Sequence, residues 1–234
     1  MKILAIDTSG PVCGVAMLVN GAVAYEAATV NKMTHSVNLL PMIDAACEAV
    51  GVTIADLDRI ACVVGPGSFT GVRIGVSTVK GLAHPHHTAC VPVDALEAMA
   101  AGVGEFAGVI CPIQDARAGQ VYGAAFRCGG NRPERLMEDI PLKLEEYVAR
   151  IRQLGERFLF VGDGMPVHRA KLQQLLGDAA VFAQPQIAYL RPASVAYLAS
   201  QATETVDYLT LEPLYLRAPN AAKNKKLTEA AGHE

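Results

Sequence analysis

Short apolar runs, separated by turn residues and by segments of helical periodicity, divide the chain into two stretches. In the first stretch, Asn20 and Gly21 separate two strand-like segments, and this dipeptide is a strong signal for a two-residue hairpin. A helical pattern follows and is stopped by Gly51. The predicted elements are strands at 2–7, 12–19, 22–29, 59–64 and 88–93, and helices at about 36–50, about 70–83 and from 94 onward.

The second stretch repeats this order of elements. Gly129 and Gly130 lie in the turn of a second hairpin-like pair, and Gly155 ends the helix that follows. The predicted elements are strands at 109–115, 120–127, 133–139, 157–161 and 179–183, and helices at about 144–154, 166–176 and 193–204.

Two successive βββαβαβα units predict an α/β protein with two lobes, each a mixed sheet flanked by helices. We expect one lobe at 1–104 and the other at 105–204, with about 205–219 packing back on the first lobe and a loose tail at 220–234. This order resembles the actin, sugar-kinase and Hsp70 ATPase-like fold, which is ribonuclease H-like. In that fold nucleotide lies between the lobes, with its phosphates against the first hairpin turn of each.

Composition favours a folded protein of a reducing compartment. Of 234 residues, 51% are hydrophobic and 18% are charged, and the net charge of −3 argues against a broad basic surface that grips nucleic acid. No apolar run reaches the length of a membrane span, and no secretory leader is expected. The six cysteines form no C-x-x-C pair and most lie in apolar runs, so we expect buried thiols and a cytoplasmic location.

The turn after the first strand is a candidate phosphate site. Asp7 and Ser9 are residues that hold a metal-bound water or face an anion in such a turn, although they are also common in ordinary turns. The corresponding turn of the second half offers Asp115 and Arg117 but no hydroxyl group. A stand-alone ATPase or sugar-type kinase is therefore an alternative interpretation. The first turn has the residues of a phosphate site, and the second turn lacks the hydroxyl group.

The stretch Val63–Gly75, "VVGPGSFTGVRIG", is the most distinctive motif. It lacks the lysine of a P-loop and the G-x-S-x-G spacing of a nucleophile elbow. An anion site at a helix N-terminus, with Thr70 as the N-cap, and a tight strand-to-helix turn are equally compatible with it. The candidate residues are Gly65, Gly67, Ser68 and Thr70.

The helices at about 36–50 and 70–83 are apolar over more than one stripe. Either the fold buries two sides of each helix, or a partner covers the second side, and we favour a partner. Metal binding is not expected, because Leu39 stands four residues after His35, where a second histidine ligand on the same helix face would lie.

The segments "MKILAIDTSG", "THSVNLLPMI", "GPGSFTGVRIGVSTVKGLA", "DARAGQVY" and "PLYLR" together resemble the TsaB (YeaZ) family of tRNA threonylcarbamoyladenosine biosynthesis proteins. The resemblance implies an accessory, non-catalytic role beside the catalytic paralogue TsaD and the ATPase TsaE, in threonylcarbamoyl transfer to the adenosine next to the anticodon. TsaD carries a His-x-x-x-His metal clamp on the helix that here begins at His35, so Leu39 implies loss of that site. An alternative metallopeptidase function is disfavoured for the same reason.

The resemblance further implies that the first two helices bind TsaD, and that a homodimer forms through the same face. It implies indirect contact with tRNA, no membrane, and no cofactor of its own, with ATP or ADP at the complex interface as an open alternative. The predicted interface residues are His35, Leu39, Leu40, Ile43, Cys47, Val72, Arg73, Val76 and Val79.

Overall fold

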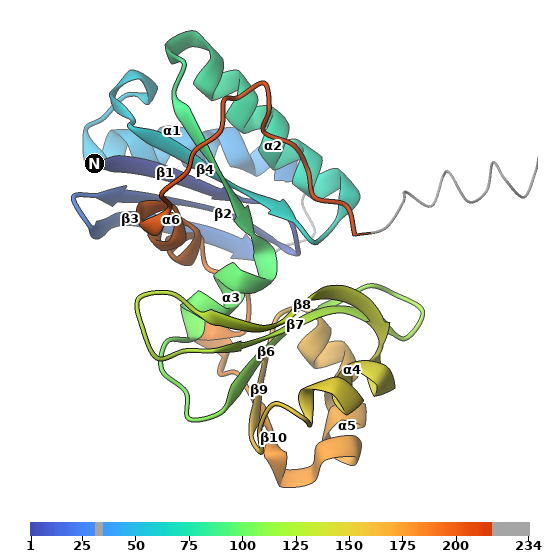
Figure 1. Ribbon diagram of the computed structural model, residues 1–234. Helices are drawn as coiled ribbons and strands as arrows, with labels where there is room; N and C mark the ends of the chain where they lie inside the picture. Colours follow the sequence, from blue (N-terminus) through green and yellow to red (C-terminus); the bar gives the residue numbers. More distant parts are fainter. Residues whose placement is uncertain (31–34, 217–234) are drawn as a thin grey trace, which may run out of the picture.

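The computed structural model describes residues 1–30 and 35–216, which form two lobes stacked on each other (Figure 1). Each lobe contains a five-stranded sheet with two antiparallel and two parallel pairings, so the predicted fold class is confirmed. The first sheet has the spatial order β3 (Ala22–Val30), β2 (Val12–Val19), β1 (Lys2–Asp7), β4 (Arg59–Gly65) and β5 (Ala89–Asp94).

The second sheet repeats this order, and the match extends to the pairing directions. Its strands are β8 (Glu134–Lys143), β7 (Gln120–Arg127), β6 (Val109–Asp115), β9 (Phe158–Val161) and β10 (Ala180–Phe182). The hairpin predicted at Asn20 and Gly21 is present, and both residues have positive φ, as its tight turn requires.

Helices α1 (His35–Val50) and α2 (Phe69–Ala83) cover one face of the first sheet. Helices α4 (Leu144–Ile151) and α5 (Gly164–Leu176) cover one face of the second. The remaining helices, α3 (Ala95–Val103) and α6 (Pro192–Gln201), lie between the lobes (Figure 1).

Helices α3 and α6 are exchanged between the two halves of the chain. Helix α3 follows the first sheet but packs on β6 and β7, whereas α6 follows the second sheet and covers β1 and β2. Glu26 of β3 fixes α6 there, since its carboxylate accepts hydrogen bonds from Arg191 and from the backbone N–H of Ala193. The predicted lobe bounds, 1–104 and 105–204, are therefore wrong at α3 and at α6, because each helix packs on the sheet of the other half of the chain.

Residues 205–216, the C-terminal strap, return to the first lobe as predicted. Val206 and Cys90 exchange both backbone hydrogen bonds, the side chain of Leu211 is buried beside α2 and β4, and the N–H of Leu214 donates to the carbonyl of Val64 at 2.7 Å. Residues 217–219 and the predicted tail, 220–234, lie outside the described residues.

Four of the six cysteines, Cys13, Cys62, Cys90 and Cys111, are buried thiols, as predicted. Burial raises the pKa of each, so they pack as small apolar side chains. Within the described ranges, no helix combines the length and apolar character that crossing a bilayer requires.

Candidate functional site

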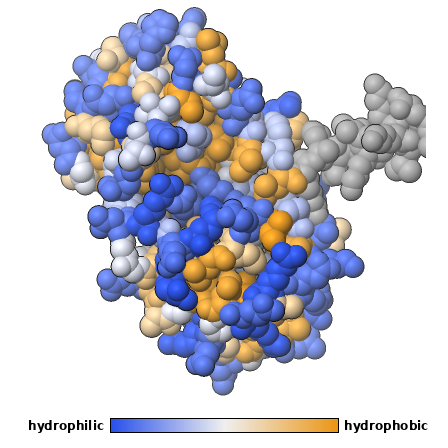
Figure 2. All heavy atoms as spheres, viewed as in Figure 1, coloured by the Kyte–Doolittle hydropathy of each residue, from blue (hydrophilic) through white to orange (hydrophobic). Residues whose placement is uncertain are grey.

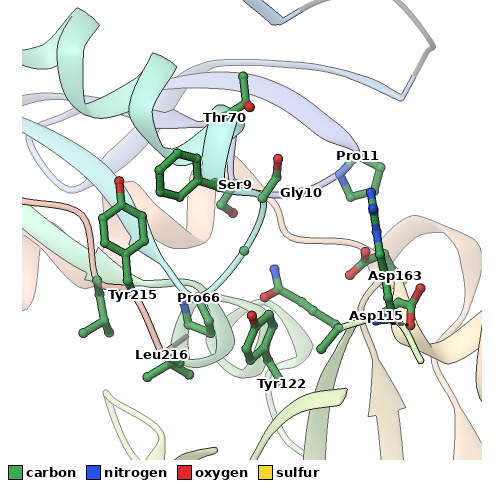
Figure 3. Close-up of a pocket in the computed structure, with 17 residues that line it drawn as sticks. Ser9, Gly10, Pro11, Pro66, Thr70, Asp115, Tyr122, Asp163, Tyr215 and Leu216 are labelled. Atoms are coloured by element: carbon green, nitrogen blue, oxygen red, sulfur yellow. Dashed lines mark hydrogen bonds between the residues drawn. The ribbon is translucent and has the colours of Figure 1, made fainter. Parts of the chain in front are cut away.

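A cleft of about 590 Å³ opens between the lobes at the carboxyl ends of β1, β4 and β6. Asp115 and Asp163 lie together at one side of it, and Tyr122, Pro66, Tyr215 and Leu216 lie toward the other (Figure 3). The lining consists of two hairpin turns, the start of α2, the residue before α5 and the end of the strap, namely residues 9–11, 66–70, 114–117, 122, 163 and 214–216.

The first turn places Asp7 under the floor of this cleft. Its Oδ1 accepts hydrogen bonds from the backbone N–H and the hydroxyl of Ser9, at 2.8 and 2.7 Å. Burial raises the pKa of Asp7 to about 6, although the two Ser9 hydrogen bonds oppose that shift. The backbone N–H and the hydroxyl of Ser9 were expected to face a phosphate. Both instead donate to Asp7.

The glycine motif packs directly against this turn. The N–H of Ser68 donates to the carbonyl of Ser9 at 2.7 Å, and the hydroxyl of Thr8 donates to the carbonyl of Gly71 at 2.7 Å. A Cβ atom added at Gly67 or Gly71 would overlap a backbone oxygen of the turn. The glycines therefore let two backbones touch, and the tight strand-to-helix turn is the interpretation that the geometry supports.

The N-cap of α2 is Ser68, whose hydroxyl accepts from the N–H of Gly71 at 3.3 Å. The prediction that Thr70 caps the helix is wrong, because α2 already begins at Phe69. Gly65 has φ of +134°, and an added Cβ would lie 2.5 Å from the carbonyl oxygen of Leu214, so the strap requires a glycine there.

The second turn also uses its polar groups internally. Arg117 and Ala118 have φ of +63° and +51°, and the N–H of Arg117 donates to Oδ1 of Asp115 at 3.0 Å. The same oxygen lies 3.5 Å from Nε2 of His168 on α5. This turn orients the Asp115 carboxylate toward α5.

Asp163 is the second carboxylate that lines the cleft. Its pKa is raised to about 6, mainly by burial, with further contributions from the charges of Asp115 and Asp7. Its Oδ1, like Oε1 of Gln114, is buried and has no hydrogen-bond partner. Sequence analysis missed Gln114 and Asp163; their signal was a polar side chain at or just after the end of a central strand.

A bound nucleotide would need donors for its phosphates and a site for its metal ion. The backbone N–H and hydroxyl of Ser9 are engaged with Asp7 and the backbone N–H of Arg117 with Asp115, whereas the Arg117 side chain is exposed and lines the cleft. Among residues 1–30 and 35–216, no three His, Cys, Asp or Glu side chains are grouped so that they could hold a metal ion. The turn donors that the sequence suggested for a phosphate are therefore engaged within the two lobes.

Helices α1 and α2 each bury one face against the first sheet and leave the other exposed. The predicted interface residues Leu39, Ile43, Val72, Val76 and Val79 lie in the hydrophobic core with β1 and β4. Their assignment to a docking surface is wrong, because the sheet of the same lobe covers them.

Other predicted interface residues lie outward or at the margin of that core. Leu40 is 52% exposed and Arg73 is exposed, while His35 and Cys47 are half-buried. His35 forms a 2.9 Å hydrogen bond between Nε2 and the carbonyl of Gly10, which ties the start of α1 to the first turn.

The start of α2 and the end of the strap meet in an exposed aromatic cluster at the mouth of the cleft. The rings of Phe69 and Tyr215 stack with centroids 5.0 Å apart. The Arg73 guanidinium lies 3.9 Å from the centroid of Phe69, and its Nε donates to the Tyr215 hydroxyl at 2.7 Å. Apolar residues also gather on the surface near the point where the grey atoms begin (Figure 2).

Comparison with known families gives a match over most of the chain. Residues 28–229 match the sequence model of the family described as TsaD: tRNA N6-adenosine threonylcarbamoyltransferase.

Two curated relatives carry the same description, tRNA threonylcarbamoyladenosine biosynthesis protein TsaB. The Bacillus subtilis protein is 34% identical over 221 residues, which cover 94% of this chain and 96% of that protein. The Escherichia coli protein is 32% identical over 223 residues, or 93% and 95% of the two chains.

Among solved structures, a Pseudomonas aeruginosa protein described as similar to peptidase YEAZ superimposes with a TM-score of 0.78 and 25% identity, over 92% of this chain and 99% of that chain. A second structure, YeaZ from the same organism, gives a TM-score of 0.73 with 24% identity over the same shares and supports the fold.

Proposed function

The chain belongs to the TsaB (YeaZ) family of tRNA threonylcarbamoyladenosine biosynthesis proteins, and from this premise we propose that it is an accessory, non-catalytic subunit. In this proposal it binds and activates the catalytic paralogue TsaD, together with the ATPase TsaE. It contacts tRNA only through that complex.

The absence of catalysis is proposed from Leu39 and from the two turns. In TsaD-like chains the second metal-binding histidine would stand at position 39; here Leu39 is 1% exposed and packs in the core under α1. The hydroxyl and amide of Ser9 are likewise engaged with Asp7. These interactions stabilise the lobe and leave no metal clamp on α1.

The docking surface is proposed to be the outward side of α1 and α2, which lie next to each other on the sheet. The side chains of Val37 and Leu40 are apolar and more than half exposed. We define the docking face as Val37, Leu40, Asp44, Ala45 and Glu48 of α1 with Phe69 and Arg73 of α2, all of which are exposed.

Charge on the docking face favours a partner with the same helix pair. Helix α1 presents the carboxylates of Asp44 and Glu48, whereas α2 presents the guanidinium of Arg73. A paralogue of the same fold, related by an approximate two-fold axis, would bring its own α1 toward α2 of this chain. The same face would serve a homodimer, so that homodimer and TsaD complex would exclude each other.

The exposed position of Leu40 is the observation that carries this proposal, and replacing it tests the proposal. We expect Leu40→Asp to remove co-sedimentation with TsaD from the same organism, because a carboxylate would have to be desolvated in an apolar contact. Val167→Asp is the matched control, since Val167 is 61% exposed on α5 of the other lobe. Equal binding by both variants would contradict the proposed face.

Binding of ATP or ADP at the boundary between this chain and its partners stays a prediction. A nucleotide titration of the assembled complex, compared with each separate protein, measures it.

A further inference from the structure

The acidic side of the cleft contains hydrogen-bond acceptors that the proposed docking role does not use. Gln114 is 3% exposed, lines the cleft, and leaves its Oε1 without a donor. Asp163 lines the same cleft and leaves its Oδ1 without a donor. These residues come from separate elements, the end of β6 and the start of α5, and meet at one site.

Each such oxygen lowers stability unless a donor occupies the cleft. An unsatisfied buried acceptor raises the free energy of the folded state, and more so when it is charged. The carboxylates of Asp115 and of the more deeply buried Asp7 add negative potential at this site, as their effect on the pKa of Asp163 indicates. The exposed Arg117 is the cation among the lining residues, and His168 lies beside Asp115.

The opposite side of the cleft is apolar and aromatic, which suits the carbon skeleton of a small organic molecule. Pro66, Tyr122, Tyr215 and Leu216 contribute apolar and aromatic surface there (Figure 3). The volume of about 590 Å³ is within the range of small-molecule sites and far exceeds the space that a single ion needs. A ligand that fills it therefore combines a cationic, donor-rich head with an apolar part.

We propose that the cleft binds a small organic molecule with a primary ammonium group, which draws the buried Gln114 Oε1 and Asp163 Oδ1 toward the cleft and donates to them, while its carbon skeleton packs against Tyr122 and Pro66. An ammonium group has three donors and no acceptor, which matches an acceptor-lined wall. A phosphate or carboxylate would face Asp115 and Asp163 instead. The aromatic wall adds attraction for a cation.

The test is ligand binding to the full-length protein, measured by calorimetry and by thermal shift at millimolar ligand. The probes are three amines, 2-phenylethylamine, L-leucinamide and 1,4-diaminobutane, with 2-phenylethanol as the neutral counterpart of the first. Magnesium chloride alone and magnesium ATP complete the set. Gln114→Leu removes an acceptor, and Asp163→Asn removes a negative charge. Asp178→Asn replaces an exposed carboxylate outside the cleft as the control.

We expect saturable binding of at least one amine and none of 2-phenylethanol. Each cleft variant should weaken that binding by about tenfold or more, because Gln114→Leu loses a hydrogen bond to the ammonium group and Asp163→Asn loses the ion pair with it. Asp178→Asn should leave the binding unchanged. Two variants in different elements guard against misfolding of either one. Three outcomes would overturn the proposal: no amine binds, binding survives in both cleft variants, or only magnesium or magnesium ATP stabilises the protein.

Discussion

The backbone N–H of Ser68 donates to the carbonyl oxygen of Ser9 across 2.7 Å, which joins the glycine motif to the first turn of the chain. Ser9 lies in the turn between β1 and β2, and Ser68 is the N-cap of α2 after β4, so the contact joins two loops that line the cleft. It explains why the motif needs glycines without assigning them to a ligand.

Replacing Gly71 by alanine should destabilise the protein by about 2 kcal/mol or more, because the added Cβ overlaps the carbonyl oxygen of Thr8. Urea unfolding measures the change. Gly81→Ala on the same helix is the control, since nothing lies within 4 Å of a Cβ there. That variant should be neutral or more stable by about 0.5–1 kcal/mol. Equal effects at both positions would argue against the packing role.

Replacing Ile43 by aspartate should unfold the first lobe, unlike the same replacement at Leu40. Ile43 is 2% exposed in the core between α1 and the sheet, and an unpaired carboxylate there is strongly destabilising. Far-ultraviolet circular dichroism and thermal unfolding of the two variants measure the difference. A folded Ile43→Asp protein that had lost only partner binding would restore Ile43 to the interface.

The strap should contribute to the stability of the first lobe through Leu211. Truncating this side chain, which is 1% exposed, to alanine should cost about 2–4 kcal/mol. Leu209→Ala, at a position 69% exposed, is the control and should change stability by less than about 0.5 kcal/mol. A similar small loss at both positions would mean that the strap is only loosely held.

The Asp163 carboxylate should make stability depend on pH. Its pKa is raised from 3.8 to about 6 in the folded protein, so the folded state binds more protons than the unfolded state between these values. The free energy of unfolding should therefore fall as pH rises through this window. Asp163→Asn should be more stable than the parent by about 2 kcal/mol at pH 8, with the gain vanishing near pH 4.

Asp178→Asn is the control for that experiment, because Asp178 is exposed. Urea unfolding of the parent and both variants across the pH range gives the comparison. A gain for Asp163→Asn that does not change with pH would show that the carboxylate is not the cause.

Local patterns predicted most of the fold, because each strand and helix has its own periodicity and turn residues. The hairpin at Asn20 and Gly21 is the clearest case. The exchange of α3 and α6 between sheets has no local signal, since it depends on pairs such as Glu26 and Arg191, which are distant in sequence. The apolar content of α1 and α2 was visible in the sequence, but the residues that face the sheet were not. Leu39 and Leu40 are adjacent in sequence, yet Leu39 is buried and Leu40 is exposed.

The site was predicted only where it coincides with a turn motif. Asp7, Ser9 and the glycines were found, but their role in packing depends on contacts across the lobe, such as that between Thr8 and Gly71. Gln114 and Asp163 come together only when β6 and β9 pair, which single-residue patterns do not reveal.

The proposed accessory role is tested most directly by reconstituting threonylcarbamoyl transfer to tRNA from threonylcarbamoyl adenylate with TsaD and TsaE of the same organism. Mass spectrometry of the digested tRNA would quantify the modified adenosine with and without this chain. We predict none from the chain alone, a large increase when it is added to TsaD and TsaE, and loss of that increase with Leu40→Asp but not Val167→Asp. Modification by the chain alone, or an equal yield in its absence, would contradict the account.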